Sequence, residues 1–292
     1  MTQSIRSLLA NLNLIDENVL EVFSIGTRDK SDIKVMRDPN SGVIFLDEFM
    51  PNDSVYERGA YRSDGLALYG KRDYEITVDV HRRLNDYKQF YVGKKILDFG
   101  CGEGSFLKGA QDSSEEVIGV EIEKSYFQNL NQDGIPCVRN LSELESKTFD
   151  TVFCFHTLEH LKDPIEILTS FSPTLNNNGN LVVEVPHAND FLLQNLKSEA
   201  FKKFTLWSQH LILHTRVSFK RFLMEAGFKN FTIQGKQRYK LSNHLNWLSF
   251  SEPGGHKGLL SSIDTDRLTK AYEESLQMID ATDTLVAVVS VD

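Results

Sequence analysis

The stretch that decides the fold is ILDFGCGEGSF, which runs from Ile96 to Phe106. Its first half is a short apolar run, as expected for a strand that is buried on both faces of a parallel sheet. Glycines then follow at every second position from 100 to 104, where the next helix begins. Glycine lets the backbone approach a ligand closely, and a helix N-terminus attracts negative groups. The stretch therefore predicts a strand–loop–helix unit that holds a small ligand.

The spacing of the loop excludes two common nucleotide sites. A dinucleotide site has the spacing G-x-G-x-x-G, and a P-loop needs Gly-Lys followed by Ser or Thr. Here the spacing is G-x-G-x-G, with Asp98 two residues before Gly100. Glu121 ends the next apolar run, EVIGVEI (116–122), where an acid accepts hydrogen bonds from ribose hydroxyls. The loop and this acid together predict an adenosine-like ligand.

Apolar runs alternate with helical segments along the chain after the loop's strand. Such alternation is typical of an α/β fold with a doubly wound, mostly parallel sheet. The predicted strands are 94–100, 116–122, 136–140, 148–155, 181–186, 228–239 and 282–292. We expect two parts, an N-terminal extension (1–90) and a sheet domain (91–292), with a polar insertion at 240–281 before the last strand.

The N-terminal extension has its own pattern. Residues 1–22 show helical apolar spacing and predict an amphipathic helix. Two β-rich runs flank the turn signal DPNSG (38–42) and predict a hairpin. Residues 51–92 are expected to be mostly helical and to help close the site.

Composition limits the partners and the compartment. Hydrophobic residues make up 40% and charged residues 25% of 292 residues, as in ordinary globular proteins. The net charge of −9 argues against a surface that coats nucleic acid. Three cysteines without paired spacing fit a reducing compartment, and no stretch resembles a signal peptide or a membrane span. We expect a cytoplasmic protein without nucleic-acid partners or stable membrane insertion; a homo-oligomer stays open.

Four segments, in order and spacing, resemble the motifs of class I S-adenosylmethionine-dependent methyltransferases. They are ILDFGCGEG (96–104), VIGVEIE (117–123), FDTVFCFHTLEHLKDP (149–164) and NLVVEVP (180–186). The resemblance covers about residues 90–235. It implies a Rossmann-like sheet of seven strands whose last strand is antiparallel, and S-adenosylmethionine as the cofactor.

The resemblance also implies which residues hold this cofactor. Asp98, Gly100 and Gly102 would surround its methionine part, Glu121 would hold the ribose, and Ile122 would pack on the adenine.

The resemblance implies three further cofactor contacts, at positions where this sequence is less similar to the family. Asn140 and Leu141 stand where the family often has an Asp and a small residue near the adenine amine, and asparagine can serve there. His156 would lie over the methyl-donor end.

The segment HTLEH (156–160) matches H-x-x-E-H, a pattern of zinc-dependent proteases. A zinc site of this type needs all five residues on one helix. The preceding TFDTVFCF is a predicted strand, and Pro164 favours a helix that begins near His160 or after it. No third ligand is evident either, so the sequence predicts no bound metal. The extension also lacks the zinc-binding cysteines that related small-molecule enzymes often carry there.

A hydroxyl acceptor benefits from a base that removes its proton, and histidine is a usual choice at neutral pH. The predicted base is His160 or His210. His160 follows the fourth strand, and His210 lies in WSQHLILHT (207–215), which resembles a segment of enzymes that act on sugars.

The predicted substrate contacts come from the edge of the sheet and from the insertion. The segment QRYKLSNHLNWLSFSEPGGHKG (237–258) resembles one in bacterial methyltransferases of surface-polysaccharide pathways. Its polar side chains suit sugar hydroxyls or a phosphate. The candidates are His187, Arg238, Asn243, His244 and His256.

These residues predict methyl transfer to a small polar acceptor, foremost a sugar hydroxyl of a nucleotide-linked or glycan precursor. Two alternatives remain: methylation of a lipid or quinone-like ring, and a partner subunit that binds S-adenosylmethionine without turnover.

Overall fold

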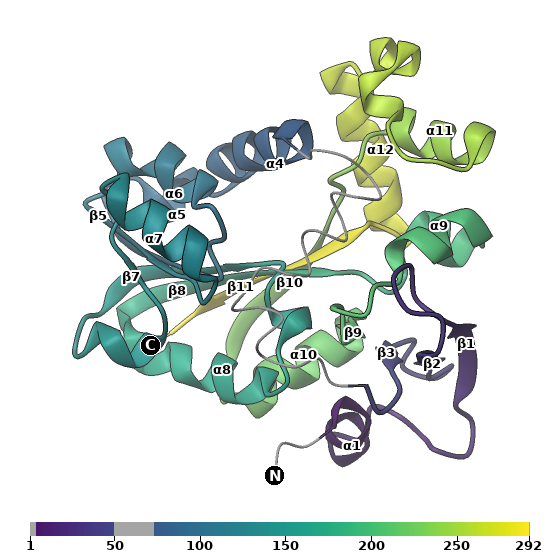
Figure 1. Ribbon diagram of the computed structural model, residues 1–292, viewed down its shortest axis with the longest axis horizontal. Coiled ribbons are helices and arrows are strands. Elements are labelled where there is room, and N and C mark those ends of the chain that lie inside the picture. Colours follow the sequence, from purple (N-terminus) through teal and green to yellow (C-terminus); the bar gives the residue numbers. More distant parts are fainter. Residues whose placement is uncertain (1–3, 50–72, 292) are drawn as a thin grey trace.

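A seven-stranded sheet forms the centre of the protein (Figure 1). The computed structural model describes residues 4–49 and 73–291, with side chains in the second range from residue 77 onward. The strand order is β10-β11-β8-β7-β4-β5-β6. The strands are β4 (Lys95–Phe99), β5 (Glu116–Val120), β6 (Cys137–Val138), β7 (Phe149–Phe155), β8 (Leu175–Pro186), β10 (Asn230–Lys236) and β11 (Thr284–Ser290). β11 pairs antiparallel with both β8 and β10, and the other pairs in this sheet are parallel, which confirms the predicted fold.

Helices cover both faces of the sheet (Figure 1). One face carries α4 (Asp73–Asp86), α5 (Lys88–Tyr91), α6 (Ser105–Ala110) and α7 (Lys124–Gln132), and the other carries α8 (Pro164–Phe171) and α10 (Arg216–Glu225). The neighbours Ile96 and Leu97 are both fully buried, but they belong to the two different apolar clusters. Alternate residues of a strand point to opposite faces, so a strand between two helical layers must be apolar throughout.

A small second sheet is built mainly by the N-terminal region. Its order is β1-β2-β3-β9, and β2 and β3 pair antiparallel as the predicted hairpin. The strands are β1 (Glu21–Ile25), β2 (Lys34–Arg37), β3 (Ile44–Leu46) and β9 (Ile212–Leu213). The predicted helix over residues 1–22 is too long, because α1 spans only Ile5–Asn11 and the β-favouring run EVFSI forms β1. Through β9, this sheet holds a segment from far along the chain.

Other boundaries also differ from the sequence prediction, most of all at β8. The strand predicted at 181–186 begins at Leu175, because Leu175 is buried and pairs with Phe149 of β7. The preceding helix ends at Phe171, before Pro173. The prediction of helices at 51–72 lies outside the described residues, whereas 73–91 is helical as expected.

The insertion before the last strand is helical. It contains α11 (Leu241–Phe250), the short 3-10 helices η6 (Gly255–Lys257) and η7 (Leu259–Ile263), and α12 (Asp266–Met278). It lies beyond the β10–β11 edge, next to the end of α4 (Figure 1). Among the described helices, none is long and apolar enough to cross a membrane.

Candidate active site

The glycine loop after β4 takes backbone angles that require glycine. Gly100, Gly102 and Gly104 have φ values of +74°, +58° and +71°. A side chain at Gly100 would collide with Thr157, and one at Gly104 would collide with Leu130. These left-handed angles disfavour any residue with a Cβ atom. The loop is therefore built as the sequence predicts, and its first glycine touches the segment that follows β7.

Glu121 ties this loop to the end of β5. Its Oε2 accepts a hydrogen bond from the Gly102 amide at 2.8 Å, and its Oε1 accepts one from the Glu123 amide at 2.8 Å. Ile122, beside it, is 42% exposed and offers an apolar surface. Asn140 and Leu141 begin the 3-10 helix η2 (Leu141–Leu144), and the exposed Asn140 amide donates to Glu143. The acid Glu121 and the apolar Ile122 are therefore adjacent, as an adenosine needs for its ribose and its adenine.

Asp98 adds a buried carboxyl at the carboxyl end of β4. It is almost fully buried, and burial raises its pKa to about 7. The nearby Arg83 acts in the opposite direction, whereas Glu121 and Glu184 add to the rise. A cation bound here would favour the ionised form of this carboxyl. The loop, Glu121 and Asp98 thus fit S-adenosylmethionine, which supplies a methyl group on a positively charged sulfur.

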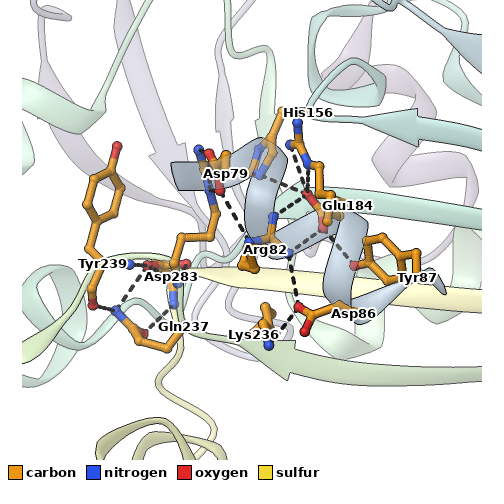
Figure 2. Close-up of polar contacts among 12 residues, drawn as sticks. Asp79, Arg82, Asp86, Tyr87, His156, Glu184, Lys236, Gln237, Tyr239 and Asp283 are labelled. Atoms are coloured by element: carbon orange, nitrogen blue, oxygen red, sulfur yellow. Dashed lines mark hydrogen bonds and ion pairs between the residues drawn. The ribbon is translucent and has the colours of Figure 1, made fainter. Parts of the chain in front are cut away.

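Beside this loop, α4 and β8 form a buried ionic cluster around Glu184 (Figure 2). Arg82 donates to both Glu184 oxygens at 2.8 and 2.9 Å, and Arg83 donates to Oε2 at 3.0 Å. The Tyr87 hydroxyl donates to Oε1 at 2.6 Å. Burial would raise the pKa of Glu184, but the two guanidinium groups outweigh it and hold the pKa well below its usual range. Glu184 is therefore an ionised carboxylate, although its side chain is 0% exposed.

Sequence reasoning missed this cluster. A glutamate inside the apolar run LVVEVP was a signal, because a charged residue on a buried strand needs a partner. Nothing local indicates that Arg82 and Arg83 are these partners, since they lie more than 100 positions away.

A second charged group adjoins the first through His156. Arg238 forms a bidentate ion pair with Asp79 of α4, and Asp283 accepts hydrogen bonds from the Arg238 and Tyr239 amides (Figure 2). Arg238 Nη1 lies 3.1 Å from His156 Nε2. Burial and the Arg238 charge lower the pKa of His156 well below 6.5, so the ring is neutral.

The protonated nitrogen of His156 follows from these contacts. Arginine only donates, so His156 Nε2 accepts and Nδ1 carries the proton. His156 itself has φ +49°, a strained angle directly after the last residue of β7. The prediction that His156 ends the strand and lies outside a helix is confirmed.

A pocket of about 260 Å³ opens beside Arg238. Its lining residues come from α4, from the turn after β10 and from the insertion. They are Val78, Asp79, Arg238, Tyr239, Lys240, His256, Ser261 and Asp264.

Two of the predicted substrate residues, Arg238 and His256, line this pocket. Asn243 is buried behind it, where its Oδ1 accepts from the Gly254 amide at 3.1 Å and lies 3.3 Å from His256 Nδ1. His187 and His244 are not among the lining residues.

His187 and His244 are both buried, and burial lowers the pKa of each to about 4. His187 Nδ1 lies 2.9 Å from the Thr282 carbonyl oxygen, and His244 Nδ1 lies 2.7 Å from the Tyr272 hydroxyl. These contacts hold β11 and the insertion in place.

The two predicted bases, His160 and His210, lie side by side. Their ring centroids are 4.9 Å apart, and the ring of Trp207 packs edge-on against both. His160 ends the 3-10 helix η3 (Leu158–His160), and α8 begins only at Pro164, as the sequence predicts. Glu159, next to them, has a side chain that is 0% exposed, and burial raises its pKa to about 8. The three side chains form a compact group after β7.

Comparison with known families identifies the domain. The family described as "Methyltransferase domain" matches residues 70–233, which is more than half of the chain. The chain belongs to this methyltransferase family. The prediction of a methyltransferase is therefore confirmed. S-adenosylmethionine, the predicted cofactor, is the one named for solved structures that share this fold.

Two curated relatives of this methyltransferase act on different acceptors. A tRNA U34 carboxymethyltransferase of Colwellia psychrerythraea is 29% identical over 153 residues, which are 48% of this chain and 45% of the relative. A ubiquinone biosynthesis O-methyltransferase of Hahella chejuensis is 25% identical over 95 residues, or 29% of this chain and 40% of the relative. The match thus spans less than half the length of each relative. Neither name supports the predicted polysaccharide branch, which stays a prediction.

Solved structures agree on the fold. A SAM-dependent methyltransferase from Archaeoglobus fulgidus superposes with a TM-score of 0.53 at 19% identity, over 79% of this chain and 99% of that chain.

Proposed function

We propose that this methyltransferase transfers a methyl group to an oxygen of a small polar acceptor that carries negative charge, foremost a sugar hydroxyl of a nucleotide-linked or glycan precursor. The observation that carries the proposal is the pocket beside Arg238, whose lining includes charged residues of both signs. A pocket for an aromatic or lipid acceptor is lined mainly by apolar side chains. Here all the lining residues but Val78 carry a polar or charged group.

The composition of the pocket suits a sugar with a phosphate. Arg238, Lys240 and His256 supply nitrogen donors, Asp79 and Asp264 supply acceptors, and Tyr239 supplies a ring. Cationic donors hold phosphate oxygens through charge-assisted hydrogen bonds, and carboxylates accept from sugar hydroxyls. The pocket volume of about 260 Å³ suits one small group of the acceptor, such as a sugar ring or a phosphate.

The residues of this protein mainly align the acceptor with the methyl group and remove the proton of the acceptor hydroxyl. Aligning the acceptor oxygen with the methyl carbon lowers the barrier by on the order of 7–11 kcal/mol. His160 and His210 are the proposed acceptors of the hydroxyl proton, since His160 follows the carboxyl end of β7 and the His210 ring lies beside it. A cytoplasmic site of action, with no nucleic-acid partner, is part of this proposal, and the three free cysteines support a reducing compartment.

A quinone-like ring is the second candidate acceptor. One relative is named for ubiquinone biosynthesis, and the insertion carries exposed apolar side chains. Leu248, Phe250 and Leu259 are 56%, 66% and 96% exposed. Such a surface suits an apolar acceptor near a membrane.

The decisive experiment measures S-adenosylhomocysteine formed by the full chain with three acceptor classes: nucleotide sugars and sugar phosphates, phenolic quinone precursors, and tRNA. We expect turnover with a member of the first class only. Lys240→Met should raise KM by about tenfold with little change in kcat, because it removes one charge from ground-state binding. Turnover with the phenols or tRNA and none with sugars would overturn the proposal. Cofactor binding is tested separately by calorimetry, where Glu121→Ala should weaken binding.

A further inference from the structure

The compact group after β7 has the chemistry of a metal site. Glu159, His160 and His210 each offer one ligand atom, and these atoms all lie within 4.8 Å of one another. Metal–nitrogen and metal–oxygen bonds of about 2.0–2.2 Å place neighbouring ligands roughly 3 to 3.5 Å apart. Small side-chain rotations would therefore close this group around one ion.

Glu159 gives an independent reason to expect a cation here. Its side chain is 0% exposed, and neither carboxylate oxygen has a hydrogen-bond partner among the described residues. His156 Nδ1 lies 3.3 Å from Oε1, outside hydrogen-bond geometry. A buried carboxyl group without a partner is costly, and protein chains normally pair such groups or use them to bind metals.

The group is held in place by the fold. The Leu211 amide donates to the Glu159 carbonyl at 2.8 Å, which joins η3 to the segment that carries His210. The Asp29 carboxylate accepts from both the amide and the hydroxyl of Ser208. β9 then pairs with β3 of the N-terminal sheet. Ligands that lie 50 positions apart in the chain are thus fixed by tertiary contacts, as preformed metal sites require.

We propose that Glu159, His160 and His210 bind a divalent transition-metal ion. Two imidazoles and one carboxylate favour Mn²⁺, Fe²⁺ or Zn²⁺ over Mg²⁺ and Ca²⁺, which prefer oxygen ligands. Three protein ligands leave coordination positions open for a further group. This proposal replaces the expectation from sequence that no metal is bound. The third ligand is His210, which the pattern H-x-x-E-H does not contain.

The location suggests that the ion binds the acceptor hydroxyl, a role that rests on the proposed function. Thr157, two residues before Glu159, touches the glycine loop, and His156 connects Glu159 with Arg238 of the pocket. An acceptor hydroxyl bound to the ion would have a lowered pKa. Its oxygen forms the bond to the methyl carbon, the carbon–sulfur bond breaks, and the electron pair stays on sulfur. The hydroxyl proton then leaves to solvent, because His160 and His210 bind the ion and no longer act as its acceptors.

The test is metal binding by the full chain after dialysis against EDTA. Titration with Mn²⁺, followed by electron paramagnetic resonance, and with Zn²⁺, followed by calorimetry, should give one ion per chain. Glu159→Gln and His210→Asn should each weaken binding by at least about tenfold. Matched controls are Glu166→Gln in α8 and the exposed His81→Gln, which should bind like wild type. Circular dichroism and calorimetry with S-adenosylhomocysteine show whether each variant is folded.

The outcomes separate this inference from the proposed function. Absence of stoichiometric binding, or binding that the two ligand variants leave unchanged, overturns the metal site. Unchanged turnover of a polar acceptor in EDTA overturns the role of the ion. Metal binding that depends on Glu159, without turnover of any sugar acceptor, supports the site and contradicts the proposed acceptor.

Discussion

Two glutamates in this methyltransferase are equally buried but differ in their partners. The side chains of Glu184 and Glu159 are both 0% exposed. Glu184 receives hydrogen bonds from two arginines and a tyrosine, and its pKa is held well below the usual range. Glu159 faces neutral His156 and two further histidines, and burial raises its pKa to about 8.

This difference distinguishes a structural charge from a binding group. Arg82, Arg83 and Tyr87 supply the charge and hydrogen bonds that Glu184 needs, so this residue joins α4 to the sheet. For Glu159, the described residues supply no cation in contact with the carboxylate. A buried acid whose pKa is strongly perturbed is a candidate for function.

The largest expected effect on stability comes from removing the charge of Glu184, which is paired with two arginines. Glu184→Gln leaves Arg82 and Arg83 buried without their carboxylate, and it should lower the free energy of unfolding by about 3–5 kcal/mol. Urea denaturation followed by circular dichroism measures this change. The double variant Glu184→Leu, Arg82→Met removes both partners of one pair and should recover part of the loss. A loss below about 1 kcal/mol in the single variant would contradict the assigned structural role.

Asp98 is a third buried carboxyl, and it should make the affinity for S-adenosylmethionine depend on pH. The pKa of Asp98 is raised to about 7, so this group ionises as pH rises through neutrality. Only the ionised form attracts a cationic ligand. The affinity for S-adenosylmethionine should therefore rise roughly tenfold from about pH 6 to about pH 8, and Asp98→Asn should remove this dependence. Calorimetry at each pH tests this, and a pH-independent wild type would refute it.

The smallest effect is expected for the uncompensated glutamate. At neutral pH without metal, Glu159 is largely protonated, because its pKa is about 8. Glu159→Gln keeps the shape and the neutral charge, so unfolding in EDTA should change by less than about 1 kcal/mol. A large destabilisation, comparable to that of Glu184→Gln, would show that both glutamates have structural roles.

The sequence predicted those features that depend on neighbouring residues. The glycine loop, Glu121 at the end of β5 and the seven strands each follow from patterns within about ten residues. Contacts between residues that lie far apart in the chain could not be predicted. Arg82 and Glu184 are 102 positions apart, and His210 lies beside His160 where the Leu211 amide bonds to the Glu159 carbonyl, a contact between distant segments. The pattern HTLEH raised the question of a metal, but its first histidine points to Arg238, and the third ligand comes from another segment.

The most direct test of this account is a crystal structure of the full chain with S-adenosylhomocysteine and Mn²⁺, with anomalous data collected for manganese. We expect one anomalous peak bound by Glu159, His160 and His210, about 2.0–2.2 Å from each ligand atom. Glu184 should remain paired with Arg82 and Arg83 in the same crystal. A manganese peak at Glu184, or none near Glu159 in a crystal whose cofactor product is well ordered, would contradict the distinction between the two glutamates.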